Sequence, residues 1–248
     1  MISEFSRSPL LSSQRVVESL FHRNTVVCEA DSDRAFYQTV AEHSVGQTAT
    51  LFVNAQNKQT VSVVVKALAA CGVESHSVVD IDILNSRDDL AALMAAHLVP
   101  KEIRERAETN RAKAALSIES VSDQQALVEI SESVKELHEQ LDRGEHTLRG
   151  ARSALDRIRR VSKWSSVKKG GLDALNEDIR KEVSESLNEL KKYGIHIVPC
   201  GELESWLDIK VSKKNWTPQA LDAILDGAAS EQLIQFVSEL VILNSSSV

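Results

Sequence analysis

Aromatic residues are scarce in this sequence of 248 residues, where phenylalanine, tryptophan and tyrosine together make up 4%. So few rings argue against a base-stacking platform for single-stranded nucleic acid. Long apolar runs are missing too, since the longest, such as residues 61–71, are far too short to span a bilayer. The first fifteen residues have no sustained apolar core and no small-residue cleavage site, unlike a signal peptide. We therefore expect a cytoplasmic protein that does not contact a membrane.

Metal sites built on sulfur or imidazole are also not expected. The three cysteines, Cys28, Cys71 and Cys200, are odd in number and far apart, which argues against a disulfide framework or a zinc site. The seven histidines show no metal-ligand spacing. A GxxxxGK(S/T) phosphate loop is absent as well, so the chain is not expected to hydrolyse ATP by itself.

Charge is distributed unevenly along the chain, whose formal net charge is −7. Residues 101–192 contain 19 of the 29 basic and 18 of the 36 acidic residues, which leaves 10 basic and 18 acidic residues elsewhere. Within that segment, residues 143–169 contain nine basic and two acidic residues. An acidic body suits metal ions and a basic stripe suits phosphates. The basic run is more typical of a solvated helix face, with a DNA contact as the alternative.

The two ends of the chain alternate strand-like and helix-like patterns. The strand candidates are residues 25–29, 49–54, 75–80 and 195–199. Helical patterns separate them, such as residues 58–71, which Gly72 closes at the expected stop position. This alternation predicts an α/β fold with a parallel, Rossmann-like sheet flanked by helices.

The middle of the chain is helical in pattern instead. Apolar residues recur at heptad spacing in 127–158, interrupted by Gly144, and again in 172–190. We expect two long helices that fold back on each other as a coiled-coil hairpin, with the reversal at residues 163–171. The predicted organisation is a lead-in at 1–22, the first part of the α/β domain at 23–98, a helical insertion at 99–192, and the second part with the C-terminal helices at 193–248.

Acidic residues follow three of the predicted strands. They are Glu29, then Asp80 with Asp82, then Glu202 with Glu204. Function gathers at the carboxyl ends of strands in an open parallel sheet, and neighbouring strands lie only about 5 Å apart. Clustered carboxylates repel unless a cation neutralises them, and a hard divalent ion such as Mg²⁺ or Mn²⁺ suits oxygen ligands. The alternation of side chains along a strand would place Asp80 and Asp82 on one side of an extended segment.

Four stretches of the sequence carry a resemblance to a known family. VVCEADSD (residues 26–33) resembles the glutamate motif that opens a TOPRIM domain, and VVDID (residues 78–82) resembles its DxD motif. VPCGELE (residues 198–204) resembles the later acidic motif of TOPRIM domains in the OLD (overcoming lysogenization defect) family. LLSSQRVVESLF (residues 10–21) resembles the linker that joins an ABC-type ATPase to such a domain.

The resemblance implies a site for two metal ions. Glu29, Asp33 and Asp82 would serve one ion, and Asp80 with Glu202 and Glu204 the other. Asp33 also has a purely structural interpretation, because an acid in the first turn favours the helix dipole. The family further implies a lysine near the scissile phosphate. Our candidates are Lys213 and Lys214, with Lys58 a weaker one.

The function that this resemblance implies is a divalent-metal-dependent endonuclease that cleaves DNA and works with an ABC-type ATPase, in cis or in trans, in antiphage defence. An RNA- or tRNA-directed nuclease with the same site is an alternative. A non-catalytic TOPRIM-like module that binds an ATPase partner or dimerises is another, and the heptad pattern permits a homodimer. A primase or topoisomerase is disfavoured, because neither tyrosine has a catalytic context and a zinc-ribbon motif is absent.

Overall fold

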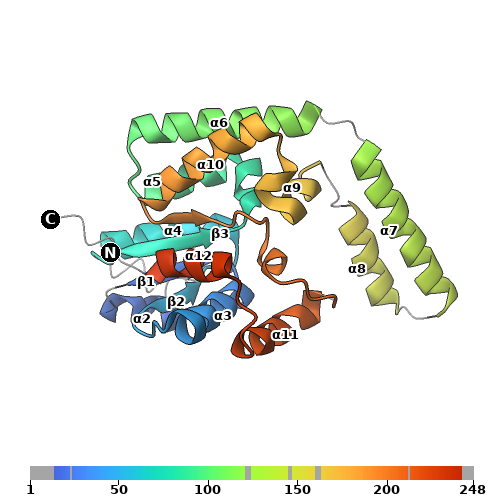
Figure 1. Ribbon diagram of the computed structural model, residues 1–248, viewed down its shortest axis with the longest axis horizontal. Coiled ribbons are helices and arrows are strands. Elements are labelled where there is room, and N and C mark those ends of the chain that lie inside the picture. The colour runs from blue at the N-terminus through green and yellow to red at the C-terminus, as the bar shows by residue number, and fades with distance from the viewer. Residues whose placement is uncertain are drawn as a thin grey trace.

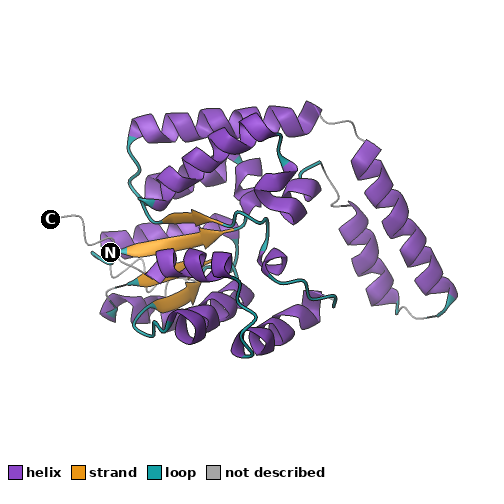
Figure 2. Ribbon diagram, in the orientation of Figure 1, coloured by secondary structure: helices purple, strands orange, loops and turns teal. Residues whose placement is uncertain are grey.

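A central sheet lies between two layers of helices, and an arm of two helices extends from one end (Figures 1 and 2). The computed structural model describes residues 14–22, 24–120, 124–144, 147–159, 163–211 and 213–241. In these segments, no helix combines the length and the apolar character that a membrane span requires.

The sheet has four strands, all parallel, in the order β2-β1-β3-β4. They are β1 (Thr25–Cys28), β2 (Leu51–Asn54), β3 (Ser75–Val79) and β4 (Ile195–Ile197). Val26 of β1 lies opposite Phe52 of β2 on one side and His76 of β3 on the other. Nearly every strand residue is buried, because helices cover both faces of the sheet. The prediction of an α/β fold with a parallel sheet flanked by helices is confirmed.

Each face of the sheet has its own hydrophobic core. Val27 of β1 belongs to the core that is shared by α4 (Lys58–Ala70), α5 (Arg87–Ala96), α6 (Lys101–Ser120) and α10 (Glu177–Lys191). Its neighbours Val26 and Cys28 point to the other face, where α3 (Asp31–Val40), α11 (Lys213–Leu225) and α12 (Glu231–Val241) pack. The two-residue alternation of a strand thus divides the helices into two layers.

Several short elements complete the described segments. They are α2 (Gln14–Glu18), η1 (Ser19–Phe21), η2 (Ala41–Val45), η3 (Ile81–Asn85), α9 (Ser165–Gly170), η4 (Gly171–Ala174) and η5 (Leu203–Trp206). Two of them, η3 and η5, follow β3 and β4 at the carboxyl end of the sheet and carry acidic residues.

The helical hairpin forms within the first heptad segment and not between the two segments. Residues 124–159 form α7 (Gln124–Asp142) and α8 (Leu148–Arg159), which pack against each other as the arm. The chain reverses at Gly144, whose φ of 68° lies in the left-handed region that glycine tolerates. The predicted reversal at residues 163–171 is therefore wrong, because residues 165–171 form α9 and the start of η4.

The second heptad segment lies on α10, which packs along α6. Asn110 of α6 donates a hydrogen bond to the carbonyl oxygen of Glu182 at 3.1 Å and another to Ser186 Oγ at 2.9 Å. Arg106 forms an ion pair with Glu189 across the same pair of helices. A heptad pattern marks the face that a helix buries without specifying its partner, so the sequence could not distinguish α6 from α7 as the neighbour of α10.

Candidate metal centre

Acids from three neighbouring strands converge at the carboxyl end of the sheet. Glu29 directly follows β1, Asp80 directly follows β3, and these two strands are paired. The Asp80 backbone N–H donates to Glu29 Oε1 at 3.0 Å, which ties the two strand ends together. Glu202 follows β4, the neighbour of β3. The predicted approach of the strand-end acids is thus observed for Glu29 and Asp80. Asp82 and Glu202 lie at the same place, since Lys168 forms ion pairs with both.

The environment of this cluster disfavours the charged form of two carboxyls. Burial raises the pKa of Glu29 to about 7, with the charges of Asp82 and Asp33 adding to the effect. Burial also raises the pKa of Asp80 to about 8, and the charge of Glu29 is the next largest cause. Desolvation and mutual repulsion therefore act together on this pair. Such perturbed carboxyls are typical of functional sites, although structural charge clusters produce them too.

Two lysines supply positive charge to the same cluster. Lys168 Nζ lies 3.2 Å from Asp82 Oδ2 and 3.8 Å from Glu202 Oε2. Lys58 Nζ lies 3.4 Å from Asp82 Oδ1. Burial would lower the pKa of Lys168, but the carboxylates of Asp82, Asp80 and Glu202 raise it overall. Lys58 was the weaker sequence candidate, whereas Lys168 was not a candidate at all.

Lys168 reaches the cluster because its helix docks closely on the loop after β4. The Leu172 N–H donates to the Pro199 carbonyl oxygen at 2.9 Å, and the Ile81 N–H donates to the Gly201 carbonyl oxygen at 3.0 Å. A Cβ on Gly171 would collide with the Pro199 carbonyl oxygen, and a Cβ on Gly201 would collide with the carbonyl oxygen of Lys168. Both glycines also have positive φ, 60° and 119°. Only glycine at these two positions allows the backbones to approach so closely.

Asp82 does not lie on an extended segment as the DxD spacing suggested. The chain turns immediately after β3, and residues 81–85 form the 3-10 helix η3, in which Asp82 is the second residue. Asp80 is the residue before this helix, and its carbonyl oxygen accepts from the Ile83 N–H at 3.1 Å. The helical turn still brings Asp82 to Lys58 and Lys168, so Asp82 joins the site by a different local geometry from the one predicted.

Asp33 and Glu204 have positions that differ from those of the central acids. Asp33 lies in the first turn of α3, and its Oδ2 accepts from the Ala30 N–H at 2.9 Å, which is a capping role. Its charge nevertheless contributes to the raised pKa of Glu29 and of Asp80. Glu204 lies in η5 and lines a neighbouring cleft with Glu202 and Lys169.

The lysine candidates Lys213 and Lys214 stay predictions. Both residues lie in the first turn of α11, but their side chains fall outside the part of the chain that the structure describes. Lys168 and Lys58 are the lysines whose ammonium groups the structure places at the acids. Sequence spacing could not identify Lys168, because it lies 86 positions beyond Asp82 in the chain.

The donor set suits a hard divalent cation in its chemistry. The ligands available are carboxylate oxygens, and a cation would offset the repulsion that raises the pKa of Glu29 and Asp80. Across residues 14–241, omitting the undescribed gaps, no three His, Cys, Asp or Glu side chains are arranged to hold a metal ion. Asp82 and Glu202 are instead engaged in ion pairs with lysines. A metal ion would therefore compete with Lys168 for Asp82 and Glu202.

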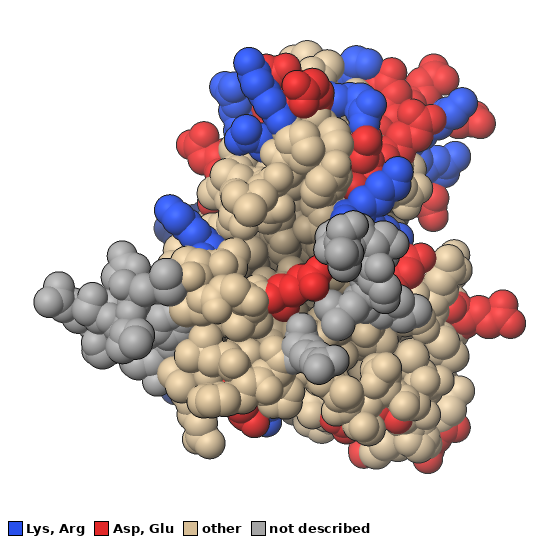
Figure 3. Space-filling view, turned by 90° about the vertical axis from the view of Figure 1, so that its left-hand side faces the viewer, with Lys and Arg blue, Asp and Glu red and all other residues tan. Residues whose placement is uncertain are grey.

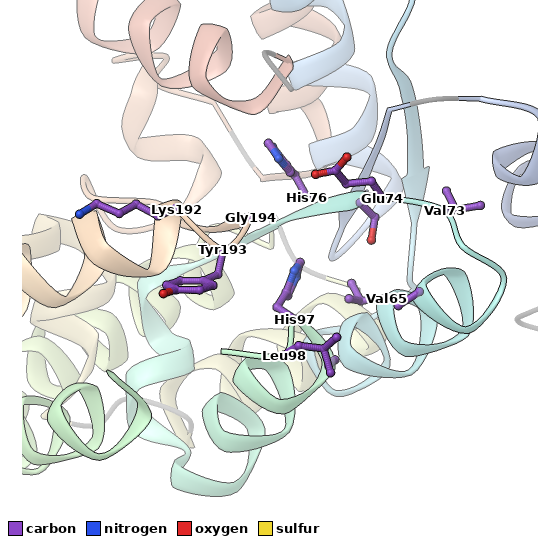
Figure 4. A pocket seen from close by; sticks show the side chains of 12 residues that line it. Val65, Val73, Glu74, His76, His97, Leu98, Lys192, Tyr193 and Gly194 are labelled. Carbon is purple, nitrogen blue, oxygen red and sulfur yellow. The ribbon is translucent and has the colours of Figure 1, made fainter. Parts of the chain in front are cut away.

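The opposite end of the sheet has a different character. A cavity of about 390 Å³ at the amino ends of β3 and β4 is lined by residues that include Glu74, His76, His97 and Tyr193 (Figure 4). Burial lowers the pKa of His97 to about 3 and that of His76 below its usual range. Figure 3 views this end of the molecule, where charged side chains of both signs intermix over α6 and α10.

A scan of protein-family models, a search of curated proteins and a search of solved structures find no match to this chain.

Proposed function

We propose that this chain is a divalent-metal-dependent endonuclease domain of the TOPRIM type, similar to those of the OLD family. The observation that carries the proposal is the convergence of Glu29, Asp80, Asp82 and Glu202 at the carboxyl ends of neighbouring parallel strands. Catalytic residues of open α/β sheets gather at this edge. The raised pKa values of Glu29 and Asp80 further support a site whose ionised carboxylates a bound cation would stabilise.

In this proposal the acids hold Mg²⁺ or Mn²⁺. Glu29, Asp33 and Asp82 would serve one ion, and Asp80 with Glu202 and Glu204 would serve the second. The bound metal supplies a Lewis acid and an activated water for phosphodiester hydrolysis. The Asp80 backbone N–H already holds the Glu29 carboxylate in place, so Glu29 would act as a ligand that needs little reorganisation.

The lysines have a role on the phosphate side. Lys168 and Lys58 place two ammonium groups beside Asp82. When a metal occupies the carboxylates, these ammonium groups become available to neutralise the scissile phosphate. Lys213 and Lys214 stay candidates for the same role. DNA is the proposed substrate, and an ABC-type ATPase, in cis or in trans, is the proposed partner in antiphage defence.

The test is a nicking assay on supercoiled plasmid with Mg²⁺, with Mn²⁺ and with EDTA. The wild type is compared with Glu29→Gln and Asp80→Asn, which keep the side-chain shape but remove the charge. Asp226→Asn is the matched control, because Asp226 is an exposed acid just beyond α11. We expect metal-dependent cleavage that is lost in both site variants and retained in the control.

A parallel measurement separates metal binding from cleavage. Thermal unfolding with and without Mn²⁺ should show a metal-dependent rise in Tm for the wild type and for Asp226→Asn, but not for Asp80→Asn. Cleavage of tRNA in place of plasmid would assign the RNA-directed alternative with the same site. Metal binding without cleavage of either substrate would leave the metal site standing and refute autonomous nuclease activity.

The second candidate is a non-catalytic module that binds an ATPase partner. The ion pairs of Lys58 and Lys168 favour it, since ammonium groups neutralise the acids in place of a metal. This candidate predicts that neither Mg²⁺ nor Mn²⁺ changes the Tm of the wild type.

A further inference from the structure

The helical arm exposes an apolar stripe that the rest of the described chain does not cover. Leu127, Val134 and Leu141 of α7 are 56%, 48% and 47% exposed, and Leu148 and Leu155 of α8 are 70% and 56% exposed. These five residues follow one another at intervals of seven. The other heptad position is less exposed where α7 meets α8, since Leu137 is 7% exposed and Ile130, Ala151 and Ile158 are half-buried. One heptad position therefore packs within the hairpin, and the side chains of the other heptad position stay exposed to solvent.

The stripe lies on a single face of the hairpin. On α7, Val134 follows Ile130 by four residues. Its side chain is therefore rotated about 40° around the helix axis, in the direction of helix winding, from the row that contains Ile130 and Leu137. On α8, Leu155 follows Ala151 by four residues and is rotated by the same angle in the same sense. Because α7 and α8 run in opposite directions, equal rotations bring the two halves of the stripe to the same side. A row of exposed apolar side chains of this kind on a solvent-exposed arm marks an interaction surface.

This face is complementary to a copy of itself. The apolar residues of both helices share a seven-residue spacing, so those of one hairpin can fit between those of another, as in a four-helix bundle. The helices also differ in charge: α7 contains five acidic residues and one basic residue, and α8 contains four basic residues and one acidic residue. A two-fold axis that sets α7 of one copy against α8 of the other pairs opposite charges.

We propose that two copies of this chain associate through the α7–α8 face and form a four-helix bundle between their arms. The occupant of the apolar stripe is thus the stripe of a second copy, with acidic α7 beside basic α8 at both symmetry-related edges. This proposal does not depend on the nuclease, because none of the five residues belongs to the acidic centre.

The test is sedimentation velocity of the full chain at low and high micromolar concentration. The monomer mass is 27.3 kDa, so a dimer is readily resolved. Val134→Glu and Leu155→Glu place a charge on the stripe, and symmetry buries each charge twice in the dimer. We expect these variants to raise the dissociation constant by more than about a hundredfold. Leu116→Glu is the control, because Leu116 is 67% exposed on α6, outside the arm.

Circular dichroism and Tm establish that each variant is folded. Hydrogen exchange of the wild type at the two concentrations gives an independent readout that needs no variant, and protection should increase within residues 127–155. A dimer of the wild type and the control that is lost in both arm variants supports the proposal. A wild type that is monomeric throughout overturns it, including the case in which the arm binds nucleic acid instead. Dimers that persist in both variants, or protection elsewhere, overturn it as well.

Discussion

Replacement of Asp80 by asparagine should stabilise the metal-free protein, and more strongly as the pH rises. Asp80 is half-buried beside Glu29, and its side chain makes no capping hydrogen bond to η3, so the substitution removes charge without breaking a cap. Burial and the charge of Glu29 raise the Asp80 pKa from 3.8 to about 8. The unfolded carboxyl ionises near its lower pKa and the folded carboxyl only near the higher one. Between these values the folded state binds more protons, so wild-type stability falls as pH rises.

The pKa shift sets an upper limit on the effect. One pKa unit corresponds to about 1.4 kcal/mol. A shift of about four units therefore limits the gain in the free energy of unfolding of Asp80→Asn over the wild type to about 5–6 kcal/mol above pH 8. Glu29 shares the same repulsion and titrates together with Asp80, so removing one charge also relieves the other. We expect a smaller net gain of roughly 2–3 kcal/mol, because the neutral amide keeps part of the desolvation cost.

Urea denaturation followed by circular dichroism, in EDTA, measures this difference at about pH 5 and about pH 8. All ionisable groups other than the coupled Asp80 and Glu29 are the same in both proteins, so their effect cancels in the comparison. Asp226→Asn, on an exposed acid, should show no comparable pH-dependent gain. A stability difference between wild type and Asp80→Asn that stays constant with pH would refute the reasoning, and so would a variant that is less stable at the higher pH.

Three further changes test other parts of the structure. Gly171→Ala should lower the free energy of unfolding in urea by at least about 2–3 kcal/mol, because the new Cβ meets the backbone at residue 199. Gly72→Ala, also at positive φ but in open space, should lower it by only about 1 kcal/mol. An equal cost at both positions would contradict the close docking of α9. Lys168→Met should bind Mg²⁺ more tightly in titration calorimetry, since its ammonium competes for Asp82; an unchanged affinity would argue against that competition. Burial lowers the pKa of His196, whose two ring nitrogens find no hydrogen-bond partner among the described residues, so this residue contributes stability that is lost as pH falls below about 6.5. His196→Leu should therefore gain stability over the wild type at about pH 5 relative to about pH 7.5, and a gain independent of pH would contradict this account.

Local patterns determined the α/β frame of this protein. Apolar runs of four to six residues separated by helical periodicity predicted strands close to those observed, with β1 at Thr25–Cys28 and β3 at Ser75–Val79. These features depend on neighbours a few residues apart, so they can be read from the chain directly. The position of Glu29 and Asp80 at strand ends followed from the same patterns, because parallel strands share one carboxyl edge.

Side-chain partners at the site depended on tertiary structure. Lys168 comes to Asp82 only because Gly171 and Gly201 allow α9 to dock against the loop after β4. Asp82 occupies a 3-10 turn instead of a strand, since the chain leaves the sheet at Asp80.

The sequence by itself determined the elements, the parallel sheet and the carboxyl edge that carries the acids, because each follows from residues close together in the chain. The tertiary structure decided which helix pairs with which. The heptad pattern of α10 is satisfied by α6, and α7 pairs with α8, although the pattern permitted other partners. An apolar seam indicates that a helix face is buried. The identity of the partner helix depends on loop geometry, such as the left-handed turn at Gly144, and on competition among all the apolar faces of the folded chain.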